Sequence, residues 1–206
     1  YYDFVTLPDG RQAVLVADVS GKGVPAALLM ARFSSDAKVS LITNSQNPAL
    51  AVAKLNETLC DAGLDDRFVT FSLTIVDPDR NVVQVVSAGH MSPMVRLPDG
   101  SIVEPAGDEN ASSLPLGIFS NAEYHLVEFP MPVGTQVVVY SDGINEAMNT
   151  ANEEYSAQRL RQNLASSQEA GKELGERLIR DVRGFSVGRS QHDDMTLVVF
   201  SRLSEN

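Results

Sequence analysis

The chain has 206 residues, 43% of them hydrophobic, which is enough to bury a core as one domain. Its 27 acidic and 16 basic side chains give a formal net charge of -11. This acidity argues against binding to nucleic acid or to anionic membranes, because both favour clustered Lys and Arg. No apolar run approaches the roughly 20 residues that span a bilayer, and no basic leader precedes an apolar stretch. We therefore expect a cytoplasmic protein without membrane insertion.

The first elements are a hairpin and two helices. Residues 2–7 and 13–17 predict two strands joined by a Pro-Asp-Gly turn. After the glycine-rich break at residues 20–23, residues 24–42 predict a helix with proline in its first turn. A second helix is expected over residues 49–61, where leucines and alanines form an apolar stripe.

The middle of the chain is rich in hairpin signals. Residues 68–76 and 81–87 flank an Asp-Pro-Asp turn, and residues 94–97 and 102–104 flank a Pro-Asp-Gly turn. The pattern predicts antiparallel sheet. Residues 104–120 lack periodicity and are rich in Gly, Pro and Ser, which indicates an irregular surface loop that is a candidate for partner recognition.

The last part of the chain alternates strands with a helix pair. Strands are expected over residues 124–129, 136–140 and 195–200, and helices over residues 155–165 and 169–183. Strands clustered in hairpins and helices in pairs favour an α+β sandwich over repeated βαβ units.

Three aspartates occur where an expected buried strand meets a loop: Asp18, Asp142 and Asp193. Each one alone is better interpreted as a turn former or a helix cap. If neighbouring strands bring the three together, they form an all-oxygen cluster, which suits hard cations such as Mg or Mn.

Other chemistries find less support. Three scattered histidines and one cysteine offer no zinc spacing. No serine lies in a Gly-x-Ser-x-Gly elbow, and residues 21–23 lack the spacing of a phosphate-binding loop.

Four motifs, in order along the chain, resemble those of a known family. They are residues 17–27 (ADVSGKGVPAA), 87–93 (SAGHMSP), 141–147 (SDGINEA) and 193–196 (DDMT). Together they resemble the SpoIIE and RsbU branch of the protein phosphatase 2C-like, metal-dependent serine/threonine phosphatases. The resemblance implies a four-layer α-β-β-α sandwich of two packed, mainly antiparallel sheets flanked by helix pairs, formed by residues 1–206 as a single domain.

The resemblance also implies a site with two divalent cations, Mn or Mg. In it Asp18 bridges the ions, Asp142 and Asp193 complete one of them, and the Val19 carbonyl helps to hold the other. A metal-bound water then attacks phosphoserine or phosphothreonine, because paired cations lower the pKa of water and neutralise charge on the phosphoryl oxygens.

Supporting roles follow for Asp194, Gly143 and His90 beside the ligands. His90 is equally well interpreted as a turn histidine that ties its loop to the backbone. Glu146 is better interpreted as capping a short helix after Gly143 than as touching a metal-bound water.

The family motif at the start reads Gly-Gly-Asp-Tyr-Tyr-Asp, and this sequence begins at the tyrosines. The first aspartate, a metal ligand, would precede Tyr1, so we expect an N-terminally truncated domain excised from a longer signalling protein. Asp3 belongs to the later position and receives no ligand role.

The resemblance further implies a phosphorylated protein substrate, an anti-sigma-factor antagonist in family members. It suggests that Ala26, Leu29 and Met30 take part in switching and homodimer formation, although packing in the core is the stronger interpretation for apolar residues at helical spacing. The alternative function is a phosphatase-fold module that binds a signalling partner without hydrolysis.

Overall fold

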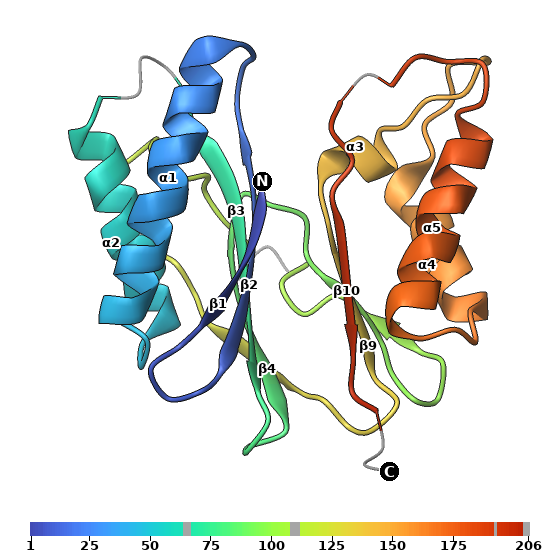
Figure 1. Ribbon diagram of the computed structural model, residues 1–206, viewed down its shortest axis with the longest axis horizontal. Helices are drawn as coiled ribbons and strands as arrows, with labels where there is room; N and C mark the ends of the chain where they lie inside the picture. The colour runs from blue at the N-terminus through green and yellow to red at the C-terminus, as the bar shows by residue number, and fades with distance from the viewer. Residues whose placement is uncertain (64–66, 108–111, 192, 204–206) are drawn as a thin grey trace. The chain divides into compact units, whose positions relative to one another are not determined.

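The computed structural model describes residues 1–63, 67–107, 112–191 and 193–203. It divides into two compact units: Tyr1–Ser92 with Pro105–Pro130, and Pro93–Glu104 with Met131–Asn206. Each unit has its own sheet and a pair of long helices (Figure 1). The predicted α+β class with mainly antiparallel sheets is confirmed, and the single domain stays a prediction.

The sheet of the first unit has the strand order β1-β2-β3-β4-β7, and β8 also pairs with β4. All pairings are antiparallel except that of β4 with β7. The strands are β1 (Tyr2–Thr6), β2 (Gln12–Val19), β3 (Val69–Asp77), β4 (Val82–Ala88), β7 (Ser112–Ser113) and β8 (Val127–Pro130). The first two predicted hairpins are thereby confirmed.

Helices α1 (Val24–Thr43) and α2 (Pro48–Asp61) cover one face of this sheet (Figure 1). Asn47 caps α2 by accepting a hydrogen bond from the Leu50 amide at 3.1 Å. Alternate residues of the strands meet the helices because successive side chains point to opposite faces. The resulting core includes Ala13, Leu15, Ala17 and Val19 of β2, with Phe33, Ala37 and Leu41 of α1.

The α1 residues named as switching candidates lie against this core. Ala26 is buried, and Leu29 and Met30 are partly buried and pack on the core cluster. Val24 and Leu28 are the exposed apolar side chains of the first turns. The core interpretation therefore accounts for the three candidates.

A buried polar side chain ties α2 to the loop before β8. Asn56 is fully buried; its Nδ2 donates to the Phe119 carbonyl and its Oδ1 accepts from the Gly117 amide, both at 2.8 Å. An asparagine on the inner face of a helix is stable only with such partners. The loop is thus held at a defined place on the helix.

The sheet of the second unit has the order β10-β9-β5-β6 and is antiparallel throughout. Its elements are β5 (Met94–Arg96), β6 (Ile102–Val103), β9 (Gln136–Tyr140), α3 (Asp142–Asn145), α4 (Ser156–Ser166), α5 (Gly171–Phe185) and β10 (Leu197–Ser201). Leu174, Leu178 and Val182 recur every fourth residue and form the buried stripe of α5. The third predicted hairpin is confirmed as β5 and β6, but it lies in this second sheet.

Tyr155 joins α4 to the end of α5. Its ring is buried and packs edge-on against Phe185 at 5.5 Å, and its hydroxyl donates to Asp181 at 2.6 Å. Burial, followed by the bond to Asp181, raises the pKa of Tyr155 to about 12. The phenol therefore stays protonated and keeps the end of α5 in position.

Two predictions about loops are corrected. Residues 104–120 were expected to form an irregular surface loop, yet Leu116 is fully buried and pairs with Val69 through N–O contacts of 2.8 and 3.0 Å. Part of that segment, residues 108–111, lies outside the described residues. The strand expected from residue 124 begins at Val127, because Tyr124 enters the core instead. Leu116 and Tyr124 both contact residues that are distant in sequence, and local periodicity carries no information about such contacts.

Candidate active site

Asp142 stands where β9 passes into α3. The strand before it is fully buried, and Ser141 keeps an extended backbone at φ -89° and ψ 163° before the helical turn begins. The extended backbone thus ends at Ser141. Asp142 is the first residue of α3 and lies half-buried just beyond the end of β9. The sequence pattern located this carboxylate correctly at a strand end.

Ser141 fastens the segment that leads into β10. Its Oγ donates to the Asp194 carbonyl at 3.1 Å and accepts from the Thr196 amide at 3.0 Å. Its own amide donates to the Thr196 carbonyl at 3.0 Å. One small side chain therefore satisfies the backbone on both sides of Met195, just before β10 begins.

Gly143 allows the same segment to approach α3 closely. A Cβ built on Gly143 would lie 2.3 Å from the Asp194 carbonyl oxygen and 2.9 Å from its carbonyl carbon. No larger residue fits without displacing backbone. The residue expected beside the ligands is thus the contact point that brings Asp142 to the segment of Asp193 and Asp194.

Asp193 and Asp194 are both exposed. The Asp193 carboxylate accepts from the Asp194 amide at 2.8 Å, and the Gln191 side chain donates to the Asp193 carbonyl at 2.8 Å. Solvent-accessible carboxylates on adjoining backbone segments are suitable donors for a hard divalent cation. The donors of the second unit are thus of the chemical kind that the implied cation takes, and their role as ligands stays a prediction.

Asp18 and Val19 belong to the first unit, at the end of β2. This strand is paired on both sides, with β1 and with β3. Asp18 lies opposite Thr70 of β3, and buried Val19 lies opposite Val69. Directly opposed residues share one face of a sheet, so the side chains of Asp18 and Thr70 are neighbours.

Thr70 also contacts His90, the candidate from the motif at residues 87–93. The Thr70 hydroxyl lies 3.0 Å from His90 Nδ1, and the Ser87 hydroxyl donates to the His90 carbonyl at 2.9 Å. Gly89 has a φ of 65°, and its Cβ would lie 2.4 Å from Pro115 Cγ. The turn therefore has its own structural support. The His90 imidazole contacts Thr70, which is the cross-strand neighbour of Asp18.

The candidates thus form two groups, one in each unit. In the first unit Thr70 lies opposite Asp18 and contacts His90, and in the second Gly143 joins Asp142 to the segment of Asp193 and Asp194. Within the described residues, no cluster of three or more His, Cys, Asp or Glu side chains that could hold a metal is found. The ligand roles of Asp18, Val19, Asp142 and Asp193 stay predictions.

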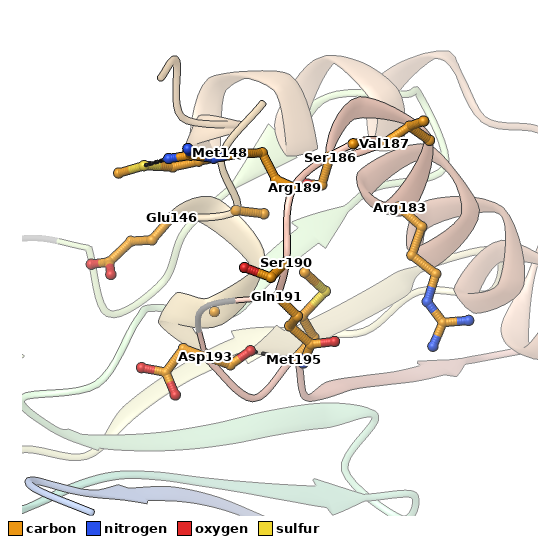
Figure 2. A pocket seen from close by; sticks show the side chains of 13 residues that line it. Glu146, Met148, Arg183, Ser186, Val187, Arg189, Ser190, Gln191, Asp193 and Met195 are labelled. Atoms are coloured by element: carbon orange, nitrogen blue, oxygen red, sulfur yellow. Dashed lines mark hydrogen bonds between the residues drawn. The ribbon is translucent and has the colours of Figure 1, made fainter. Parts of the chain in front are cut away.

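Sequence reasoning missed several residues near these groups. A cavity of about 600 Å³ beside Asp193 is lined by Met148, Arg183 and Arg189, which were missed, and by Glu146, which was named only as a cap or a contact to metal-bound water (Figure 2). Thr70 was missed as well, although its place opposite Asp18 follows from the register of the β2–β3 pair. The two arginines carried no motif signal.

Comparisons with known proteins identify relatives over nearly the whole chain. A family model described as Stage II sporulation protein E (SpoIIE) matches residues 8–203. Phosphoserine phosphatase RsbU of Bacillus subtilis (strain 168) is 28% identical over 208 residues, which cover 98% of this chain and 58% of that protein. The chain therefore spans little more than half the length of this relative.

Solved structures show the same fold. The SiaA-PP2C domain of Pseudomonas aeruginosa has a TM-score of 0.84 at 19% identity, covering 98% of this chain and 79% of that one. The PP2C phosphatase domain of SpoIIE from Bacillus subtilis, with a fragment of its regulatory domain, has a TM-score of 0.81 at 20% identity, covering 97% and 57%. RsbX in complex with magnesium has a TM-score of 0.66 at 16% identity, covering 97% and 84%.

Proposed function

The chain belongs to the SpoIIE family, and on this premise we propose that it is a metal-dependent protein serine/threonine phosphatase acting on a phosphorylated regulatory protein. The observation that carries the proposal is the contact of Gly143 with Asp194, which joins Asp142 to the segment of Asp193. A relative named as a phosphoserine phosphatase, RsbU, supports the reaction class.

In this proposal Asp18, Asp142, Asp193 and the Val19 carbonyl hold two divalent cations, Mn or Mg. Bound cations would lower the pKa of water and neutralise charge on the phosphoryl oxygens. Oxygen donors at strand ends suit these ions, and a structural neighbour, RsbX, was solved with magnesium.

The remaining residues orient these donors. Ser141 holds the backbone on both sides of Met195, so the Asp193 and Asp194 carboxylates start from a fixed segment. Thr70 is the cross-strand neighbour of Asp18 and contacts His90, and in this proposal His90 is a positioning residue for the end of β2 and not a ligand. Substitution of residues that orient metal ligands commonly lowers metal affinity or activity by about 10- to 100-fold.

The substrate in this proposal is a phosphorylated anti-sigma-factor antagonist, as the family resemblance implies. A cytoplasmic location and a homodimer remain hypotheses. Within the described part of the chain, no helix has the length and apolar character needed to cross a membrane.

The proposal is tested by phosphate release from an aryl phosphate and from a phosphoserine peptide in the presence of Mn. The chain and a form extended upstream of Tyr1 are compared, each as the parent, as Asp142→Asn and as Asp79→Asn. Asp79 is an exposed acid in the β3–β4 turn and serves as the matched control.

We expect Mn-dependent turnover that falls at least about 100-fold in Asp142→Asn and changes less than about twofold in Asp79→Asn. Mn should also raise the thermal midpoint of the parent more than that of Asp142→Asn, because a ligand that binds the folded state stabilises it. Folded protein without turnover in any form would instead favour the binding module.

A further inference from the structure

A groove in the second unit adjoins the Asp193 segment. Its volume is about 600 Å³, and its walls come from the end of α3, the turn after it, the end of α5 and the loop that leads to Asp193. Gly143 and Asp193 belong both to the groove and to the candidate active site. A bound chain that reaches Asp193 therefore continues directly into the groove.

The walls of the groove are held by their own contacts. Asn149 closes one turn, because its Oδ1 accepts from the amides of Ala151 and Glu153 at 2.9 and 3.0 Å. Gly188 in the opposite loop approaches Thr150 so closely that a Cβ would lie 3.0 Å from its methyl carbon. The groove is therefore largely preformed, as small-molecule and peptide sites usually are.

The groove carries charges of both signs. Figure 2 shows the carboxylates of Glu146 and Asp193 on one side and the Arg183 guanidinium on the other. Arg183 is exposed, and within the described residues it makes no hydrogen bond or ion pair. A second arginine, Arg189, is held at the rim by Asn152 at 2.9 Å. Two arginines on one groove are notable in a chain of net charge -11.

Apolar side chains line the space between these charges. Met148 is 38% exposed and Val187 is 73% exposed, and Met195 also contributes to the lining. Methionine adapts its shape to different apolar partners, which suits a surface that receives a side chain of a polypeptide. The lining thus combines apolar contact with the exposed guanidinium of Arg183.

Resting on the proposed function, we propose that this groove binds the substrate polypeptide beside its phosphorylated residue. An acidic side chain of the substrate pairs with Arg183, and an apolar side chain packs on Met148 and Val187. The phosphorylated residue lies at the Asp193 end, where cations would offset the carboxylates, and the flanking residues run toward Arg183. The groove therefore selects substrates by the charge of one flank.

The experiment uses phosphoserine peptides in which a single Glu, or a single Lys, is moved along either flank. The ratio of kcat/KM for each peptide to kcat/KM for an aryl phosphate is measured in the parent, Arg183→Ala, Arg183→Glu and Arg180→Ala. Arg180 lies one turn earlier on α5, is exposed and does not line the groove, so it is the matched control.

We expect one Glu position to be preferred. For that peptide, Arg183→Ala should lower the ratio about tenfold, and Arg183→Glu should shift the preference to Lys at the same position. Arg180→Ala should keep the parent profile. A profile that is the same in all four proteins, or an equal loss for Glu and Lys peptides, would overturn the groove assignment.

Fluorescence anisotropy of the same labelled peptides with Asp142→Asn protein separates this inference from the proposed function. Weaker binding of the Glu peptide on Arg183→Ala in that background supports the groove even if no phosphate is released. Hydrolysis of the aryl phosphate with unchanged peptide binding would retain the phosphatase and reject the groove.

Discussion

The two units hold their candidate carboxylates by different means. Asp18 lies on β2, a strand with hydrogen-bonded neighbours on both sides. Asp193 precedes β10, an edge strand, and its segment is held to Asp142 by the Ser141 side chain and the close approach of Gly143. The first arrangement depends on a backbone ladder, and the second depends on two small residues.

This difference concentrates sensitivity in the second unit. A strand that is paired on both sides is held by many backbone hydrogen bonds. Side-chain substitutions around such a strand therefore change the position of its end little. A contact through one serine and one glycine has no such redundancy. Substitutions at Ser141 and Gly143 should therefore act on the carboxylates more strongly than comparable changes around Asp18.

The largest effect is expected for Gly143→Ala. Its Cβ would meet the Asp194 carbonyl oxygen at 2.3 Å, so the backbone of that segment must move. We expect a loss of about 3 kcal/mol in the free energy of unfolding. Mn-dependent turnover should also fall at least about 100-fold. Denaturant unfolding and phosphate release measure the two effects.

Gly184→Ala is the control for this substitution. Gly184 lies on α5 with no heavy atom within 4 Å of a built Cβ, so alanine should stabilise the helix by about 0.5 to 1 kcal/mol. Equal changes in the free energy of unfolding in Gly143→Ala and Gly184→Ala would show that the close contact of Gly143 with the Asp194 carbonyl does not contribute to stability.

Asn56→Ala tests whether the first unit also depends on a single side chain. The substitution leaves the Gly117 amide and the Phe119 carbonyl without their partner on α2, and we expect a loss of about 2 kcal/mol. Aryl phosphate turnover should fall less than in Gly143→Ala, because β2 keeps both of its paired strands. Thr58→Ala, at an exposed site of the same helix, should stay within about 0.5 kcal/mol. A loss of turnover as large as that of Gly143→Ala would contradict the comparison.

Ser141→Ala and Thr70→Val compare the two units directly. Removing the Ser141 hydroxyl deletes bonds on both sides of Met195, so we expect a loss of about 1 kcal/mol and Mn affinity about tenfold weaker. Thr70→Val removes only the contact with His90 and should weaken Mn binding less. Calorimetric titration with Mn measures the affinity of both variants. A larger loss of affinity in Thr70→Val than in Ser141→Ala would show that the paired strand β2 holds its carboxylate less firmly than Ser141 holds the Asp193 segment.

The smallest effect is a pH dependence at one surface carboxylate in each unit, each paired with an arginine. Arg177 lowers the pKa of Glu169 to about 2, and Arg11 lowers the pKa of Asp9 to about 2. Each carboxylate stabilises the fold above its ordinary pKa near 4, and this contribution is lost as the pH falls toward 2. Glu169→Gln and Asp9→Asn should lower the thermal midpoint slightly at pH 7 and match the parent near pH 2. A difference that persists at pH 2 would assign the effect to packing instead.

Much of the fold could be predicted from local patterns. Apolar runs and turn residues located β2, β3, β4 and β9, and helix start signals and helical spacing located α1, α2, α4 and α5 within a few residues. The patterns could not assign Leu116 to the core or the β5–β6 hairpin to a separate sheet. These outcomes depend on partners that lie dozens of residues away.

The sequence by itself predicted that Asp18 lies near the end of β2, that Asp142 follows β9 closely and that Asp193 precedes β10, and four ordered motifs indicated the family. Only the tertiary structure decided that Gly143 receives the Asp194 carbonyl, that Thr70 lies opposite Asp18 and contacts His90, and that Arg183 lines a groove beside Asp193. Periodicity is a property of neighbouring residues, whereas close approach depends on which distant segments the folded backbone brings together.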